Sequence, residues 1–385
     1  MLVKALGTTA MGTLSIGICG GGVGGLTAAL ALQRAGHSVV VFEQSAQFAR
    51  VGADLNLTPN AVRALDGLRL GDEIRATAAR PTHRISRIWD TGEETSRLEM
   101  ADTAERVYGA PQLTVHRADF LNALRSKLPP DVIELGRRVT AIGSGPAGVR
   151  ITFAGGDTFD VDALVGADGI HSVVRNALFG PENPEFTGLV SYRAVVPRAK
   201  LSIPNLDAFT KWWGPTPDVQ IVTFPLNRGE ETFVFATTPQ DDWREESWTL
   251  KGDVEELRRV YANFHPEARA LLDACTEVTK SALYVRQPMP QWSVGRTTLL
   301  GDACHPMVPF MAQGACMAIE DAVVLGRALE GVGTTGVAAA FGRYEEARKE
   351  RTARVQQGSR GNEWLKQGGN ADWVYGYDAW RVALA

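Results

Sequence analysis

The glycine-rich segment GGGVGG at residues 20–25 constrains the fold of this 385-residue chain more than any other feature. The apolar run LSIGIC precedes it, and an Ala- and Leu-rich segment that ends near Gly36 follows it. This order predicts a strand, a tight turn and a helix. Gly20, Gly22 and Gly25 fit the pattern G-x-G-x-x-G, in which glycine lets the backbone approach a pyrophosphate and lets the helix pack on the sheet.

A second apolar strand, HSVVVFEQ, follows this helix and carries Glu43 near its end. The acid lies 23 residues after Gly20, a spacing at which such an acid accepts hydrogen bonds from a ribose. Unpaired N–H groups at the helix N-terminus would face the phosphates. Strand, turn, helix and acid together predict a dinucleotide-binding unit and leave open whether it binds FAD or NAD. A plain glycine-rich loop is the alternative.

Composition excludes several other classes of protein. A net charge of −4 offers no broad basic surface, so we expect no binding to nucleic acid or to anionic lipid. No apolar run reaches the roughly 18 residues that a membrane span needs. The four cysteines form no Cys-x-x-Cys pair, so we expect no metal site and a reducing, cytoplasmic location. The length suggests two domains, or one large domain with an insertion. We expect a monomer or homodimer.

Three later segments also connect a predicted strand to a helix. In ALVGADGIHSVVR, residues 163–175, Asp168 and Gly169 follow an apolar strand. In TTLLGDACHPMVPFMAQGACMAIEDA, residues 297–322, Asp302 follows a strand and Gly314 opens a helix. In LTVHRADFLNAL, residues 113–124, Arg117 lies just before a helix.

These motifs, in this order, resemble those of the class A flavoprotein aromatic hydroxylases, the para-hydroxybenzoate hydroxylase superfamily. The resemblance extends over residues 14–380 and implies FAD as cofactor, with NADH or NADPH as a transient reductant. It implies an α/β (α+β) fold with a Rossmann-like FAD-binding domain, an inserted β-sheet substrate domain and a C-terminal helix. The expected segments are 14–80, 105–182 and 285–340 for FAD, 81–104 and 183–284 for the substrate, and 341–385 for the C-terminal helical part.

The resemblance also assigns roles to individual residues. The glycine turn and Glu43 would hold the ADP half of FAD, Arg117 and Asp302 its ribityl region, and Gly314 its isoalloxazine ring. Asp168 and Gly169 would serve both FAD and the visiting NAD(P)H. The predicted cofactor-binding residues are Gly20, Gly22, Gly25, Glu43, Arg50, Arg117, Asp168, Gly169, Asp302, Pro309 and Gly314.

The segments KWW at 211–213, YEEARKERTARVQ at 344–356 and DWVYGYDAW at 372–380 narrow the resemblance to 6-hydroxynicotinate 3-monooxygenase-like enzymes. This implies a hydroxypyridine or hydroxybenzoate carboxylate as substrate, sometimes hydroxylated with loss of the carboxylate. The stretch GADLNLTPN at 52–60 departs from the GAGIHIGPN of such relatives, so Asn56 replaces a histidine. Asp218 and Val222 likewise stand where relatives carry a histidine and a tyrosine.

His305 and Asn56 are the predicted catalytic residues, since His305 is the remaining titratable group near the flavin loop and Asn56 can hydrogen-bond a substrate. A structural loop histidine is the alternative reading of His305. The predicted substrate pocket contains Asn56, Tyr192, Arg193, Phe209, Gln220, Val222 and Phe310.

The implied activity is that of a single-component monooxygenase. It would use NAD(P)H and O2 to hydroxylate a small aromatic substrate through a C4a-hydroperoxyflavin. The alternatives are an FAD-dependent reductase or halogenase on the same fold, and a non-catalytic FAD-binding redox sensor.

Overall fold

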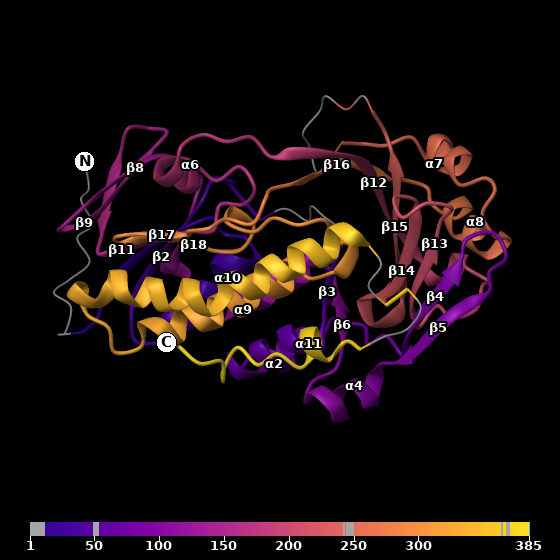
Figure 1. The fold of residues 1–385 in the computed structure, drawn as a ribbon, viewed down its shortest axis with the longest axis horizontal. Coiled ribbons are helices and arrows are strands. Elements are labelled where there is room, and N and C mark those ends of the chain that lie inside the picture. Colours follow the sequence, from indigo (N-terminus) through magenta and orange to yellow (C-terminus); the bar gives the residue numbers. More distant parts are fainter. Residues whose placement is uncertain are drawn as a thin grey trace.

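The computed structural model describes residues 12–48, 54–241, 243, 250–362, 365–366 and 370–384. The predicted cofactor residue Arg50 lies outside these ranges. Figure 1 shows a sheet wrapped by helices at one end of the molecule and a larger sheet at the other. This arrangement, with a parallel Rossmann-like sheet, confirms the predicted α/β (α+β) fold class.

A mostly parallel six-stranded sheet, ordered β17-β18-β11-β1-β2-β7, forms the centre of the first part. Its strands are β1 (Ser15–Cys19), β2 (Ser38–Glu43), β7 (Ile133–Leu135), β11 (Ala163–Gly166), β17 (Ser293–Val294) and β18 (Thr297–Leu299). Strands β1 and β11 are buried along almost their whole length, which is why they read as apolar runs without alternation.

Strands β1, β11 and β18 run parallel, so their carboxyl ends meet at one edge of the sheet. Gly20, Asp168 and Asp302 each follow one of these ends within three residues. Three segments that are far apart in the sequence therefore converge at this edge, where ligands of open α/β sheets bind.

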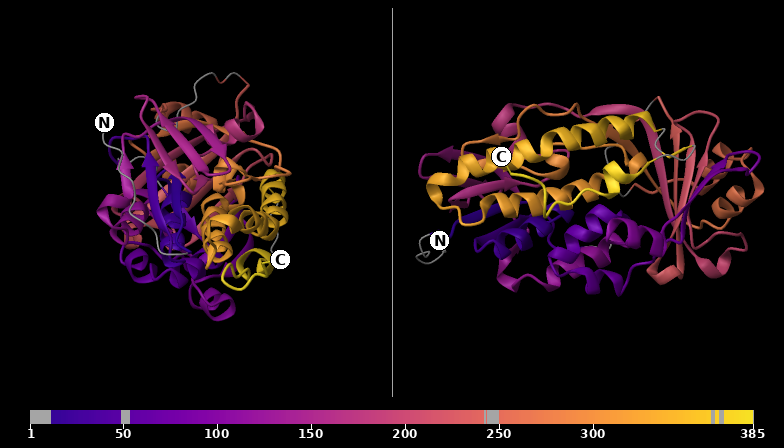
Figure 2. Two further views of the ribbon diagram at one scale, coloured as in Figure 1. Left: turned by 90° about the vertical axis from the view of Figure 1, so that its left-hand side faces the viewer. Right: turned by 60° about the horizontal axis from the view of Figure 1, so that its bottom comes forward.

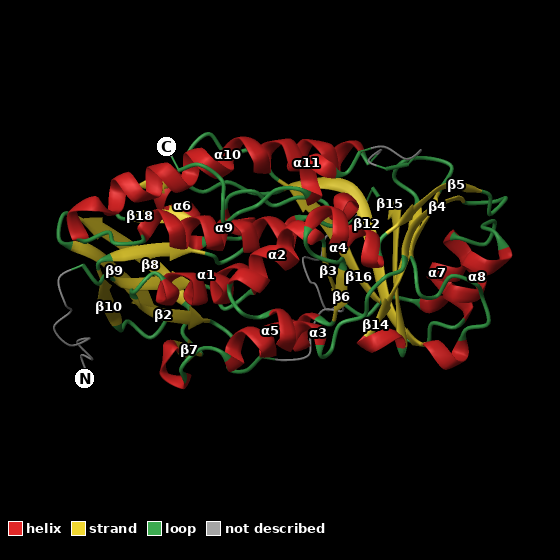
Figure 3. Cartoon of the chain, turned by 90° about the horizontal axis from the view of Figure 1, so that it is seen from below, coloured by secondary structure: helices red, strands yellow, loops and turns green. Residues whose placement is uncertain are grey.

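Helices and a small antiparallel sheet surround this core (Figure 3). The longest helices, α9 and α10, pack together along the molecule, and α1 packs against α9. The helices of this part are α1 (Val23–Arg34), α2 (Pro59–Gly67), α3 (Gly71–Arg75), α4 (Ala101–Tyr108), α5 (Arg117–Ser126), α6 (Val173–Phe179), α9 (Gly314–Leu329), α10 (Val337–Gly361) and α11 (Asp372–Tyr375). The small sheet contains β8 (Val139–Gly145), β9 (Gly148–Phe153) and β10 (Thr158–Val161). No described helix is long and apolar enough to cross a bilayer.

A seven-stranded sheet, ordered β16-β12-β15-β14-β13-β4-β5, forms the second part. Its strands are β4 (His83–Ile88), β5 (Glu94–Glu99), β12 (Glu185–Pro197), β13 (Phe209–Trp213), β14 (Gln220–Leu226), β15 (Glu231–Pro239) and β16 (Thr279–Val285). Helices α7 (Val254–Val260) and α8 (Pro266–Asp273) cover its outer face. A two-stranded sheet of β3 (Leu55–Leu57) and β6 (Leu113–Val115) lies between the two parts.

A buried ion network attaches α10 to α9. Arg348 of α10 places Nη1 2.7 Å from Glu320 and Nε 2.7 Å from Asp321, and all three side chains are fully buried. Arg351 adds an ion pair with Glu320 at 2.8 Å. Figure 2 shows α10 running along the molecule toward the larger sheet, where its C-cap Asn362 accepts a hydrogen bond from Lys211 of β13. The network thus fixes a helix that contacts both parts.

Candidate functional site

The predicted glycine turn joins β1 to α1 with the geometry that the motif requires. Gly20 has φ +104°, a left-handed conformation that favours glycine. A Cβ on Gly25 would lie 1.9 Å from the carbonyl oxygen of Gly20, so a side chain there would force the turn open. At Gly22 the nearest atom to such a Cβ is Nη2 of Arg117, 3.8 Å away, which leaves room for a ligand beside the turn.

Glu43 lies at the same turn. Its Oε2 accepts a hydrogen bond from the N–H of Gly21 at 2.8 Å, and its Oε1 accepts one from the N–H of Ser45 at 2.8 Å. These bonds fix the carboxylate at the end of β2, next to the glycine turn. A contact between Glu43 and a ribose stays a prediction.

Asp168 caps the helix that follows it. Its Oδ2 accepts hydrogen bonds from the N–H groups of Val173 at 2.8 Å and Val174 at 3.2 Å, and its Oδ1 accepts one from Ser172 Oγ at 2.5 Å. Gly169, with φ +78°, makes the turn possible. The geometry therefore explains both residues by local structure, and their cofactor contacts stay predictions.

Asp302, unlike Asp168, faces the cavity. Asp302 lines the main cavity and is exposed there, and desolvation raises the pKa of Asp302 although His305 and Arg117 lower it. Gly314 begins α9 at the same cavity, and the nearest atom to a Cβ placed on it would be Met307 Cγ at 3.8 Å. A carboxylate acceptor, an open glycine and a 16-residue helix pointing its N-terminus at the cavity fit the ribityl hydroxyls and the ring of FAD.

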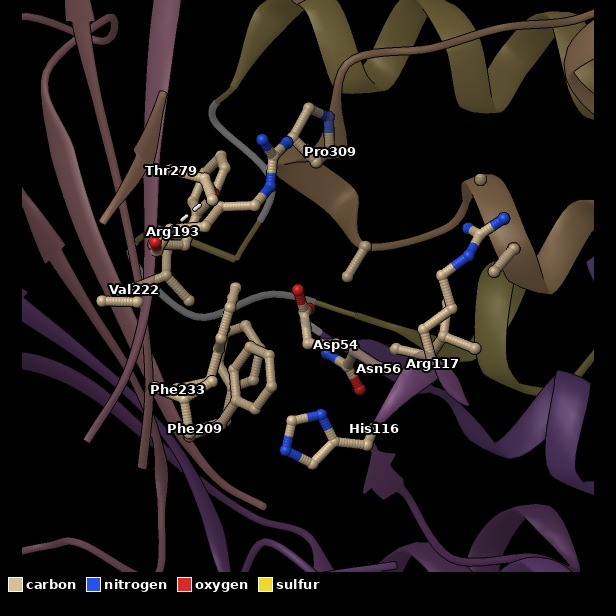
Figure 4. Close-up of a pocket in the computed structure, with 18 of the residues that line it drawn as sticks. Asp54, Asn56, His116, Arg117, Arg193, Phe209, Val222, Phe233, Thr279 and Pro309 are labelled. Carbon is tan, nitrogen blue, oxygen red and sulfur yellow. Dashed lines mark hydrogen bonds between the residues drawn. The ribbon is translucent and has the colours of Figure 1, made fainter. Parts of the chain in front are cut away.

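The main cavity has a volume of about 820 Å³ and lies between the two parts of the molecule. Figure 4 shows the seven-stranded sheet on one side, with Arg117 on the other side and Pro309 beyond Arg193. The predicted residues that line this cavity are Asn56, Arg117, Arg193, Phe209, Gln220, Val222, Asp302, Pro309, Phe310 and Gly314. The structure thus brings the predicted flavin-ring contacts and most predicted pocket residues together.

Aromatic rings form much of the sheet side of the cavity. Phe209 and Phe224 stack with their centroids 5.4 Å apart and their planes 6° apart. Phe233 contacts Phe224 with a centroid distance of 4.9 Å. Such a wall suits a planar aromatic ligand and keeps water away from it.

Comparison with known proteins identifies the family. The family described as "FAD binding domain" matches residues 13–359. The chain belongs to this family. It is 39% identical over 372 residues to the 6-hydroxynicotinate 3-monooxygenase of Bordetella bronchiseptica, with 96% of each chain covered. It is 36% identical to the 3-hydroxybenzoate 6-hydroxylase of Polaromonas naphthalenivorans, with 90% of this chain and 86% of that protein covered.

The solved structures agree with this assignment. The Klebsiella pneumoniae HpxO protein complexed with FAD and uric acid superposes with a TM-score of 0.82 at 27% identity, over 94% of this chain and 91% of that one. These relatives confirm the predicted family resemblance, FAD as cofactor and the class of FAD-dependent monooxygenase. Among the described residues of this flavoprotein, no group of three acids, histidines or cysteines could hold a metal ion.

The prediction that Tyr192 lines the pocket of the flavoprotein is wrong. Successive side chains of β12 point to opposite faces of the sheet. Arg193 lines the cavity, whereas Tyr192 is buried on the outer face against Leu257 and Tyr261 of the α7 region. Sequence reasoning could not separate the two because this strand is largely buried on both faces.

His305 does not line the cavity either. Its side chain is buried, and Nε2 lies 2.5 Å from Oδ2 of Asp321 on α9. The turn after β18 directs the ring inward, since the N–H of His305 donates to the carbonyl of Gly301 at 2.9 Å. This geometry favours the structural alternative and places the predicted catalytic histidine behind Asp302, away from a substrate in the cavity.

Two predicted pocket residues carry polar atoms without a protein partner. Both amide atoms of Gln220 are buried and without a hydrogen-bond partner. Asn56 accepts a hydrogen bond from Gln112 at 2.7 Å through Oδ1, while its Nδ2 has no partner. Buried polar groups are normally paired, so these atoms indicate positions where a ligand or water binds.

Sequence reasoning missed several residues that line the cavity, among them Asp54, His116 and Lys211. His116 places Nε2 3.1 Å from Oε2 of Glu231, and its Nδ1 is buried without a partner. Lys211 donates to Asn362 at 2.6 Å. Each of these residues lies in or next to a segment that the sequence had already connected with the site. Asp54 is in the stretch that contains Asn56, His116 precedes Arg117, and Lys211 begins the KWW segment.

Proposed function

We propose that this flavoprotein hydroxylates a small aromatic or N-heteroaromatic ring that already carries a hydroxyl group, with O2 and NADH or NADPH as co-substrates. The observation that carries the proposal is the cavity itself. It joins the FAD-facing residues Asp302 and Gly314 to a phenylalanine wall. The related 6-hydroxynicotinate and 3-hydroxybenzoate enzymes support a substrate of the hydroxypyridine or hydroxybenzoate carboxylate class.

Bound FAD would supply the redox chemistry, taking a hydride from NADH or NADPH and activating O2 for transfer of one oxygen atom to the ring. Asp302 and Gly314, with Arg117 nearby, are the residues that would hold its ribityl and ring portions. Phe209 and Phe224 orient the substrate ring and exclude water, which protects the reaction from unproductive loss of oxidising equivalents.

Arg193 is the candidate anchor for a substrate carboxylate. Its guanidinium projects from β12 into the cavity, and Nη1 donates to Ser281 Oγ at 2.5 Å, which fixes its position (Figure 4). Planar guanidinium groups bind carboxylates through two parallel hydrogen bonds. Gln220 and Asn56 would then hydrogen-bond other polar atoms of the ring. The four cysteines of the described chain are free and buried, which favours a reducing compartment such as the cytoplasm.

The test is to measure NADH, NADPH and O2 consumption by the purified holoenzyme across a panel of hydroxylated pyridine and benzene carboxylates. Products are identified by mass, and released CO2 is measured in parallel. A compound that stimulates both consumptions and gains one oxygen atom supports the proposal, and CO2 release would show loss of the carboxylate. Nicotinamide oxidation without O2 uptake would instead identify a reductase.

A further inference from the structure

The cavity lining contains two acids that the proposed function has not used, Asp54 and the exposed Glu277, and Asp54 is the less exposed of the two. Asp54 immediately precedes β3 and lies two residues before Asn56 on an extended segment. Both residues line the cavity. Figure 4 shows the Asp54 carboxylate near the middle of the space, with Arg193 of the sheet on one side and Arg117 of α5 on the other.

Asp54 lines the cavity and is partly exposed. Among the described residues, the hydrogen-bond donor that lowers the pKa of Asp54 is its own backbone N–H. Burial raises the pKa of Asp54 to about 6, against the opposing effects of Arg193 and Arg117. The group is therefore largely ionised at neutral pH and can still take up a proton close to neutrality, the property expected of a general base.

The other polar groups of the cavity suit this role less well. Asn56 can donate a hydrogen bond to a hydroxyl, but an amide takes up no proton. His116 is bonded to Glu231 through Nε2, and its Nδ1 is buried without a protein partner. Asp302 lies on the side of Gly314 and α9, where we propose that FAD binds.

We propose that Asp54 is the proton acceptor for the ring hydroxyl of the substrate, an inference that rests on the proposed function. In this step the O–H bond of the substrate breaks, an O–H bond forms on Asp54, and the electron pair stays on the substrate oxygen. The resulting oxyanion makes the ring carbons ortho and para to it more electron-rich. The negative charge moves from Asp54 to the substrate oxygen and stays near Arg193 and Arg117, which face Asp54. Asp54 returns its proton to water after turnover.

The experiment compares the Asp54→Asn and Asp54→Glu holoenzymes with wild type, using the hydroxyaromatic acid that wild type hydroxylates in the panel above. The control is Asp72→Asn, which removes an exposed acid on α3, far from the cavity lining. FAD content, the melting temperature and ligand binding to the oxidised enzyme, followed by the change in flavin absorbance, establish that each variant is folded and binds substrate.

Product formation in a single turnover is then measured as a function of pH. Asp54→Asn is expected to lower the rate at neutral pH by about 100-fold or more, the scale of general-base catalysis, with a smaller loss at alkaline pH where the hydroxyl ionises without help. Asp54→Glu should recover part of the rate, and Asp72→Asn should change it less than about twofold. A ring-fluorinated substrate analogue, with a more acidic hydroxyl, should restore most of the rate to Asp54→Asn.

An Asp54→Asn enzyme that keeps the wild-type rate and pH profile would overturn the assignment. So would a loss that is equal at all pH values and is not relieved by the fluorinated analogue, because that pattern indicates a positional role only. If wild type itself hydroxylates no compound of the panel, the proposed function fails, which is a separate and recognisable outcome.

Discussion

Gln220 is a cavity residue whose side chain lowers the stability of the substrate-free protein and is available to bind a ligand. Gln220 is 1% exposed, yet both polar atoms of its amide are without a partner. A buried polar group in this condition costs the folded state about 1–3 kcal/mol. Its position on β14, beside the phenylalanine wall, indicates that a ligand supplies the missing hydrogen bonds.

Gln220→Leu is therefore expected to raise the free energy of unfolding of the substrate-free enzyme by about 1 kcal/mol and to weaken substrate binding roughly tenfold or more. Urea unfolding and titration of the flavin absorbance with substrate measure the two effects. The matched control is Gln356→Leu, because Gln356 is also buried but donates to Pro306 at 3.0 Å. That change should destabilise the protein. A Gln220→Leu enzyme with lower stability and unchanged affinity would contradict the prediction.

Asp302 lines the cavity, as does Gly314, and we propose that Asp302 holds the ribityl part of FAD. Asp302→Ala is expected to weaken FAD binding by about 10- to 100-fold, because a hydrogen bond from a hydroxyl to a charged acceptor contributes about 1.5–3 kcal/mol. The measurement is the dissociation constant of FAD, from the recovery of flavin fluorescence on dilution. Glu330→Ala, an exposed acid just after α9, is the control. Full retention of FAD by Asp302→Ala after gel filtration would refute the ribityl assignment.

At the scale of elements, short sequence patterns correctly predicted the turns, strands and helices that are set by neighbouring residues. The glycine turn, the strand before it and the helix after it lie where the sequence places them, since turn chemistry and apolar runs act over a few residues. The long helix near the C-terminus spans Val337–Gly361. Its C-cap Asn362 is left-handed, a conformation that asparagine tolerates.

Side-chain direction across elements was harder to predict. Arg193 and Tyr192 are neighbours on a strand buried on both faces, so composition does not reveal which side chain enters the cavity. The direction of His305 depends on Asp321, which lies on the following helix. The role proposed for Asp54 depends on its position opposite the guanidinium groups of Arg193 and Arg117, which come from distant segments. These residues depend on tertiary contacts that no local pattern contains.

The attachment of α10 to α9 yields a prediction at this scale. Arg348→Met removes the cation that pairs with Glu320 and Asp321 and leaves two buried carboxylates without it. We expect the free energy of unfolding to fall by about 3–5 kcal/mol, measured by urea denaturation of the holoenzyme. Lys349→Met is the control, because this lysine neighbours Arg348 and is partly exposed, 3.9 Å from Glu345. Equal stability of the two variants would show that Arg351 alone neutralises the cluster.

At the scale of the whole molecule, Asp54 links stability to pH. Its pKa is raised from 3.8 to about 6 in the folded protein. Between these values the folded state keeps a proton that the unfolded chain has lost, so this group makes the free energy of unfolding fall as pH rises. Asp54→Asn should therefore stabilise the substrate-free protein at about pH 8 and change its stability little at about pH 4. Urea unfolding at both pH values measures this, and an equal shift at both would contradict it.

The meeting of β1, β11 and β18 at one edge of the sheet also has a consequence for biosynthesis. The glycine turn leaves the ribosome early. Asp302, which follows β18 at the same edge of the sheet, is made only when more than three quarters of the chain has been synthesised. Pairings between such distant segments form slowly, because large loops must close first. A nascent chain that ends before Asp302 therefore lacks part of the proposed FAD site. We expect FAD to bind only after the last long-range pairings have formed.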